Sequence, residues 1–134
     1  VKRIMEDAGF KQIRLIEWIK TNPVPLNSKR NYLSNAREVA LLGVKISKPT
    51  FNSFYDNGIY QFPICHEKGR FHPTQKPYPL MWNLIEKHSE AGETVLDTFA
   101  GAATTLLAAK NSGRKYIGCE LDEEFFDKAA KRLQ

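Results

Sequence analysis

The most informative stretch of the sequence is Val95-Leu96-Asp97-Thr98-Phe99-Ala100-Gly101-Ala102-Ala103-Thr104-Thr105. It reads as an apolar strand that ends in an acid and turns through small residues into a helix. Such a turn leaves backbone N–H groups unpaired at the helix start, and small side chains let a ligand approach them. A second apolar stretch, residues 116–119, ends in Glu120. An acid about 20 residues beyond the first turn is where a nucleotide-binding βαβ unit holds a ribose. The pattern therefore predicts a Rossmann-like α/β cofactor domain.

The turn favours S-adenosylmethionine over a dinucleotide. A dinucleotide fingerprint needs G-x-G-x-x-G, whereas Gly101 is the one glycine here and alanine follows at 102 and 103. Asp97 would also repel a pyrophosphate, but it tolerates the amino group and sulfonium of S-adenosylmethionine. Glu120 would hold the ribose hydroxyls. The alternative is a plain βα turn followed by a surface acid.

A second motif, His72-Pro73-Thr74-Gln75-Lys76-Pro77, lies upstream of an apolar helical pattern over residues 78–89. HPTQKP, the turn sequence DTFAGAATT and GCELD at 118–122 together resemble the amino-methylating DNA methyltransferases, which methylate N6 of adenine or N4 of cytosine. Residues 18–23 (WIKTNP) and 35–45 extend the resemblance over nearly the whole chain. The resemblance implies a partial S-adenosylmethionine-dependent methyltransferase fold that acts on double-stranded DNA, with adenine N6 favoured over cytosine N4.

The resemblance also implies a set of cofactor-binding residues. Residues 99–101 would line the methionine end, Glu120 would bind the ribose, residues 121–122 would lie beside the adenine, and Lys76 would close the carboxylate end. The full set is His72, Thr74, Lys76, Pro77, Asp97, Phe99, Ala100, Gly101, Thr104, Glu120, Leu121 and Asp122.

The catalytic motif of this family is absent from the 134 residues. Its members carry D/N/S-P-P-Y/F/W, which captures the flipped-out base, and Asn22-Pro23-Val24-Pro25 is the nearest sequence but not a match. We therefore assign no catalytic residue.

The motif order resembles the C-terminal part of the permuted enzymes, which begins mid-domain, and we expect no methyl transfer by this stretch alone. A missing N-terminal half or a second copy would be the partner. A cloned fragment, a proteolytic remnant, a broken prophage gene and one half of a split restriction-modification enzyme all fit. The alternatives are an inactive DNA-binding remnant or regulatory partner, then an RNA or protein methyltransferase or a nucleotide oxidoreductase; HPTQKP and the lack of G-x-G-x-x-G disfavour the last group.

Ala103 departs from the family, which commonly has a second glycine there. If this position needs a positive φ, alanine costs roughly 1 kcal/mol or more. If it already lies in the first helical turn, alanine costs nothing. The strongly helical sequence from Thr104 onwards favours the helical conformation at Ala103.

The net charge of +5 is concentrated in residues 1–50, which hold ten Lys or Arg against four Asp or Glu. A basic region away from the cofactor site suits a polyanion, although a solvated basic surface is the alternative. We expect four residues to hold the DNA backbone: Lys20, Lys29, Arg30 and Arg37. The aromatic-rich segment 50–71 would be a short recognition segment or a small satellite core.

The expected organisation is one partial methyltransferase domain, with central strands and a DNA-side loop at 1–49, recognition at 50–71 and cofactor binding at 72–134. Local patterns predict helices ending near Gly9 and over 78–89, 104–111 and 123–133, with Asp122 as a cap, and strands over 12–19 and 37–45. No apolar run approaches the roughly 18 residues of a membrane span, and no signal peptide is visible. Cys65 and Cys119 form no C-x-x-C, so we expect a reduced cytoplasmic protein without a metal.

Overall fold

The computed structural model describes residues 1–24, 33–45, 48–66 and 68–134. It contains two compact units. The first comprises Val1–Pro49 and Ser53–Ile64, and the second comprises Thr50–Asn52 and Cys65–Gln134. No helix in these described ranges is long and apolar enough to cross a bilayer.

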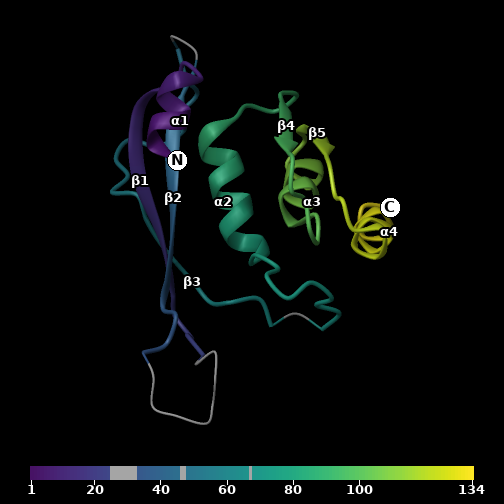
Figure 1. Cartoon of the computed structure of the whole chain (residues 1–134). Helices are drawn as coiled ribbons and strands as arrows, with labels where there is room; N and C mark the ends of the chain where they lie inside the picture. The colour runs from purple at the N-terminus through teal and green to yellow at the C-terminus, as the bar shows by residue number, and fades with distance from the viewer. Residues whose placement is uncertain (25–32, 46–47, 67) are drawn as a thin grey trace. The chain divides into compact units, whose positions relative to one another are not determined.

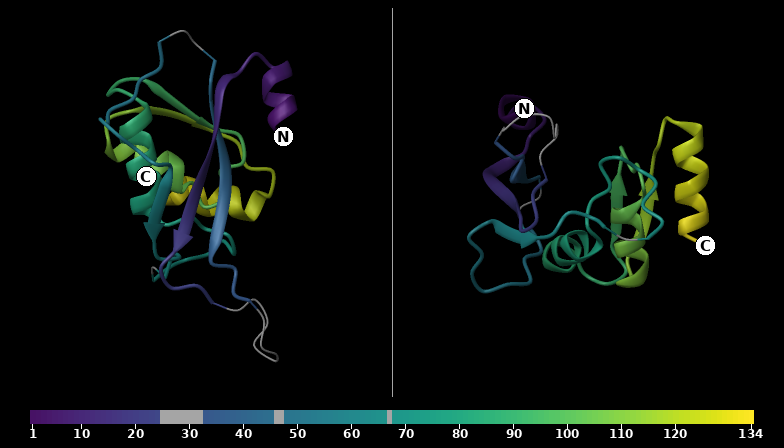
Figure 2. Two further views of the ribbon diagram at one scale, coloured as in Figure 1. Left: turned by 90° about the vertical axis from the view of Figure 1, so that its left-hand side faces the viewer. Right: turned by 90° about the horizontal axis from the view of Figure 1, so that it is seen from below.

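The first unit is built on a three-stranded sheet (Figure 1). Its elements are α1 (Lys2–Asp7), β1 (Lys11–Lys20), β2 (Arg37–Val44) and β3 (Ile59–Phe62). The central strand, β1, pairs antiparallel with β2 and parallel with β3. The β1–β2 pair forms the long twisted ribbon in Figure 2. Helix α1 and strands β1 and β2 confirm the sequence prediction, whereas β3 lies in a segment for which the sequence predicts no strand.

Side chains from the WIKTNP sequence hold β3 in place. Trp18 and Tyr60 are partners in the β1–β3 register, and each is 7% exposed. Trp18 Nε1 donates a 2.9 Å hydrogen bond to the carbonyl of Phe62, and Oδ1 of Asn22 accepts one of 2.7 Å from the backbone N–H of Ile64. These bonds attach β3 and the residues after it to the end of β1, so part of segment 50–71 belongs to the sheet.

The second unit is a parallel βαβ unit with two further helices. Its elements are α2 (Tyr78–His88), β4 (Thr94–Asp97), α3 (Thr104–Asn111), β5 (Lys115–Gly118) and α4 (Glu123–Arg132). Strands β4 and β5 are parallel, and α3 packs against both strands and against α2 (Figure 1). Asp122 caps α4 by accepting a 3.0 Å bond from the N–H of Phe125, which confirms the predicted cap.

Small residues let α3 pack closely in this unit. Ala108 and Ala109 are completely buried and form a core with Ile85 of α2. On the strand side, a Cβ on Gly118 would lie 2.3 Å from Cδ1 of Leu106, so only glycine permits this approach of strand and helix. Close packing of α3 holds the turn before it against the ends of the strands.

Ala103, immediately before α3, has a left-handed conformation with φ 55° and ψ 30°. The expectation that alanine here already lies in the helix is therefore wrong. The left-handed region costs an alanine about 1–2 kcal/mol. Its methyl group is completely buried in a cluster with Leu106 and Ala129, and this burial, about 0.8 kcal/mol, offsets part of the cost.

Candidate functional site

The carboxyl ends of β4 and β5 meet at one edge of their sheet. Asp97 and Gly118 are partners in the parallel register. Beyond the strands, the N–H of Cys119 donates to the carbonyl of Asp97 at 3.0 Å, and the N–H of Ala100 donates to the carbonyl of Cys119 at 2.8 Å. The DTFAG and GCELD turns are therefore bonded to one another at the edge where open α/β sheets bind their ligands.

Glu120 connects the two turns through its carboxylate. Oε2 accepts a 2.7 Å bond from the N–H of Gly101, and Oε1 accepts a 3.0 Å bond from the N–H of Asp122. Donation from the N–H groups of Asp122 and Gly101, with smaller contributions from Leu121 and the charge of His72, lowers the pKa of Glu120, against a raising effect of desolvation. The carboxylate is thus held in its ionised form, and its remaining lone pairs can accept hydroxyl donors.

His72 brings the HPTQKP loop to the same place. A Cβ on Gly101 would lie 3.4 Å from Nε2 of His72, so the imidazole covers the side of the turn that lacks a side chain. The imidazole ring also packs against Phe125 of α4, with 4.4 Å between ring centroids. Nδ1 of His72 lies 3.2 Å from Oγ1 of Thr74. All three sequence motifs therefore contribute to one site.

Two large apolar side chains of the site face solvent. Phe99 is 90% exposed and Leu121 is 101% exposed, each in the turn after its strand. Asp97 accepts a 3.1 Å bond from the N–H of Phe99, which fixes the first turn. Apolar side chains presented in this way can cover the flat faces of a ligand.

The other predicted cofactor residues differ in position. Pro77 is buried at the N-cap of α2, and Lys76 before it is half-buried. Thr104 is 4% exposed, and its hydroxyl accepts a hydrogen bond from Arg132. Its side chain therefore supports the turn from the protein interior and is not available to a ligand. Gln75, which sequence reasoning did not assign, is 7% exposed and donates from Nε2 to Sγ of Cys65 at 3.3 Å. It anchors the HPTQKP loop.

The predicted DNA contacts are partly described. Lys20 lies 2.9 Å from Oε1 of Glu38, and its side chain is 10% exposed. Arg37 is 67% exposed in its side chain and lies 3.7 Å from Oε1 of Glu17. Lys20 is thus tied to the sheet, whereas Arg37 reaches solvent. Lys29 and Arg30 lie outside the described residues.

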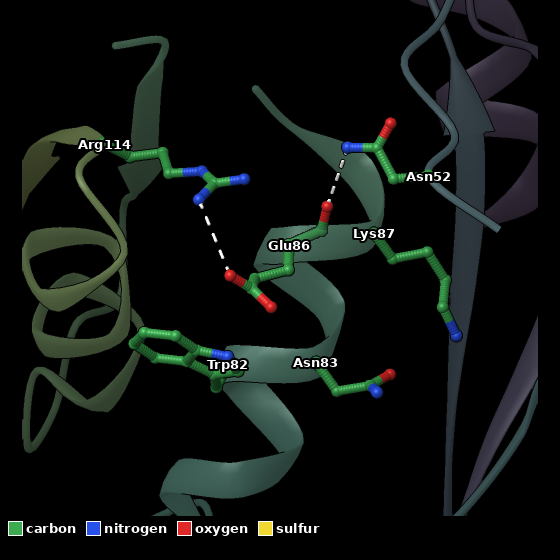
Figure 3. Close-up of a pocket in the computed structure, with 6 residues that line it drawn as sticks. All are labelled: Asn52, Trp82, Asn83, Glu86, Lys87 and Arg114. Atoms are coloured by element: carbon green, nitrogen blue, oxygen red, sulfur yellow. Dashed lines mark hydrogen bonds and ion pairs between the residues drawn. The ribbon is translucent and has the colours of Figure 1, made fainter. Parts of the chain in front are cut away.

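A pocket of about 390 Å³ lies elsewhere in the second unit (Figure 3). It is lined by Asn52, Trp82, Asn83, Glu86, Lys87 and Arg114. Asn52 donates from Nδ2 to the carbonyls of Glu86 and Ser89, and Arg114 donates to the carbonyl of Ser89 at 2.7 Å. These donors pair with backbone carbonyl groups at the C-terminal end of α2. Arg114 lies before β5, whereas Glu120 of the candidate site lies after it. The pocket is therefore a helix-capping structure that contains none of the predicted site residues.

Within the described residues, no three His, Cys, Asp or Glu side chains gather as metal ligands would. The groups at the strand ends are instead backbone N–H donors, two carboxylate acceptors and apolar side chains.

Comparison with known proteins identifies the family. A family model described as DNA methylase, covering N6 and N4 methylation, matches residues 1–131. The type II methyltransferase M.HinfI of Haemophilus influenzae is 33% identical over 98% of this chain, and M2.DpnII of Streptococcus pneumoniae is 31% identical over 97%. This chain covers 42% of the first relative and 54% of the second, about half their length.

A solved structure shows the same fold. The crystal structure of M1.HpyAVI in complex with SAM is 37% identical to this chain, with a TM-score of 0.82. The match covers 98% of this chain and 67% of that one. The expected Rossmann-like methyltransferase fold is confirmed, and it is partial in length.

Proposed function

The chain belongs to the DNA methylase family of N6 and N4 amino-methyltransferases, and on this premise we propose that it forms the S-adenosylmethionine-binding part of such an enzyme. One observation carries the proposal. The imidazole of His72 lies against Gly101, whose N–H donates to Glu120, so that HPTQKP, DTFAG and GCELD meet in one site.

The chemistry of the site fits this ligand. The carboxylates of Asp97 and Glu120 suit a molecule that carries a sulfonium and an amino group. Glu120 is held ionised with lone pairs left for the ribose hydroxyls. Leu121 and Phe99 offer exposed apolar surface for the adenine and for the methionine end, respectively. Lys76 with Thr74 and Pro77 would close the carboxylate end.

When bound, S-adenosylmethionine supplies an activated methyl group. The residues of this chain would bind and orient that molecule, but capture of the target base draws on a D-P-P-Y-type motif that the 134 residues do not contain. We therefore propose that this stretch alone does not methylate DNA. A part that carries the motif, in the same protein or in a partner, would complete the enzyme.

Double-stranded DNA is the proposed macromolecular substrate, with adenine N6 as the target over cytosine N4. Lys20, Lys29, Arg30 and Arg37 would contact the DNA backbone, with Lys20 contributing least because its ammonium is paired with Glu38. Residues 50–71 would contribute to recognition, since Phe54 is 99% exposed and Tyr55 is 96% exposed. Residues 1–49 would form the central strands and the DNA-side loop, and residues 72–134 would form the cofactor-binding part. Because the catalytic motif is missing, an inactive DNA-binding remnant or regulatory partner is the second candidate function.

Calorimetry on the purified chain tests cofactor binding. We expect one S-adenosylmethionine per chain, and affinity at least about fivefold weaker in Glu120→Ala because a charged acceptor is lost. Glu124→Ala is the matched control, since that carboxylate pairs with Lys128 on the surface of α4. No binding by the wild-type chain, or equal affinity in folded Glu120→Ala, would refute the proposal.

Transfer of labelled methyl groups to double-stranded DNA tests the division of labour. The chain alone should transfer none, and adding the motif-bearing half of a full-length relative should restore transfer. Mass spectrometry of digested DNA then distinguishes N6-methyladenine from N4-methylcytosine. Robust transfer by residues 1–134 would show that the catalytic site has been misplaced, whereas DNA binding without any cofactor affinity would favour the second candidate.

A further inference from the structure

Arg132, the last residue of α4, is bonded to the turn that precedes α3. Its Nη1 donates to the carbonyl of Ala102 at 2.9 Å and to Oγ1 of Thr104 at 3.0 Å. These two acceptors flank Ala103, the residue in the left-handed conformation. A charged donor makes stronger hydrogen bonds than a neutral one. One guanidinium thus bridges the strained residue from both sides.

The same face of α4 contacts the site along its length. Phe125, Ala129 and Arg132 lie at positions i, i+4 and i+7, which share one side of a helix. Phe125 packs against His72, and Ala129 packs in the buried cluster that contains Ala103. Helix α4 therefore supports both the HPTQKP loop and the DTFAG turn.

The N–H of Gly101, which donates to Glu120, lies within the same turn. The N–H of Ala103 donates to the carbonyl of Ala100 at 2.7 Å, and Gly101 between them has φ 52°. A helical φ at Ala103 would change the direction of the chain between Ala102 and α3. We expect this to strain the bond from Ala103 to Ala100 and, with it, the turn that presents the N–H of Gly101 to Glu120.

We propose that Arg132 is a positioning residue of the cofactor site, whose guanidinium fixes the turn at 102–104 so that the N–H of Gly101 meets Glu120. The inference rests on the proposed function of this site. It goes beyond the role that a cation at a helix C-terminus ordinarily has, which is to stabilise the helix dipole.

Lys110 provides a matched control. Its Nζ donates to the carbonyls of Leu133 and Gln134, so it holds the same end of α4 as Arg132 does. Among the described residues it makes no hydrogen bond to the turn, because its side chain leaves α3 near the opposite end from Thr104. Loss of Lys110 should loosen α4 without moving Gly101.

The experiment compares Arg132→Met, Arg132→Lys and Lys110→Met in the full 134-residue chain. Calorimetry with S-adenosylmethionine should give affinity about fivefold weaker or more in Arg132→Met, an intermediate loss in Arg132→Lys, and no change in Lys110→Met. Amide exchange by NMR should become faster at Gly101 in both Arg132 variants but not in Lys110→Met. If Arg132→Met does not fold, Arg132→Lys carries the test.

Equal affinity and equal exchange at Gly101 in the Arg132 and Lys110 variants would overturn the inference alone. A wild-type chain that binds no S-adenosylmethionine would overturn the proposed function and this inference with it. The exchange at Gly101 is measured without ligand, so it separates the two failures.

Discussion

The backbone N–H of Gly101 donates a 2.7 Å hydrogen bond to Oε2 of Glu120, a residue 19 positions further along the chain. This bond joins the turn after β4 to the turn after β5. Glu120, the residue predicted to bind a ribose, is therefore also a structural hydrogen-bond acceptor.

The pH dependence of cofactor binding should reflect the lowered pKa of Glu120. Backbone donors, first that of Asp122 and then that of Gly101, favour the ionised carboxylate. Affinity that needs this carboxylate is full above its pKa and is lost as pH falls through the lowered value. We expect binding to persist below the pH range of about 4–5 in which an ordinary Glu titrates.

Calorimetry as a function of pH, with circular dichroism to monitor folding, measures this pH dependence. Glu120→Gln should show no such titration, and a loss of wild-type affinity at or above the ordinary range would contradict the assignment.

Ala103→Gly should change stability by less than about 1 kcal/mol. Relief of the left-handed alanine, about 1–2 kcal/mol, is offset by the lost methyl burial and the flexibility of glycine in the unfolded chain. In a helical turn the same substitution would cost about 2 kcal/mol, the sum of the helix penalty and the lost methyl. Urea unfolding measures the difference, and a loss near 2 kcal/mol would speak for the helical alternative.

Affinity for DNA should fall as salt rises, because backbone contacts release counterions. Replacing Lys29 and Arg30 together with Gln should reduce the slope of log affinity against log salt by up to about 2. Lys20→Met is the informative comparison. The Lys20 ammonium is already paired with Glu38 in the sheet, so this change should alter the slope less. Fluorescence anisotropy at several salt concentrations measures both slopes, and an unchanged slope in the double variant would reassign Lys29 and Arg30 to solvated surface.

The chain should self-associate when it is purified alone. Leu96 and Ile117 are partners across the β4–β5 register and are 61% and 56% exposed, so one face of this sheet presents apolar surface. Neither strand has a second strand partner among the described residues. Sedimentation velocity should show a dimer or larger species, and Leu96→Thr with Ile117→Thr should shift it towards the monomer. A monomer for the wild-type chain at high concentration would refute this expectation.

Elements with strong local signals were predictable from the sequence. The helix over residues 104–111 follows a turn and ends before a Ser-Gly pair, and Asp122 precedes an amphipathic helix, so caps and periodicity sufficed. Strand β3 was not predictable in this way. It has four residues, and its partner β1 lies about 40 residues earlier, so neither alternation nor a hairpin turn marks it.

Two features of the site depend on tertiary contacts that the local sequence does not determine. The left-handed Ala103 is held against the preference of alanine by tertiary contacts, namely the buried cluster with Leu106 and Ala129 and the bonds of Arg132 to the residues on either side. Arg132 reads as a cation at a helix end, and its bond to the turn follows from the packing of α4. The spacing of Phe125, Ala129 and Arg132 was the available signal, because it places all three on one helical face. The convergence of His72 with Gly101 and Glu120 was predictable, since the three motifs pointed to one ligand.

A titration of the isotopically labelled chain with S-adenosylmethionine, followed by amide NMR, locates the binding site. We expect the largest shifts at the amides of Gly101, Leu121 and Asp122, and no shifts at the amides of residues that line the capping pocket, such as Asn83 and Arg114. Shifts confined to that pocket, or no shifts at a concentration that saturates related methyltransferases, would contradict it.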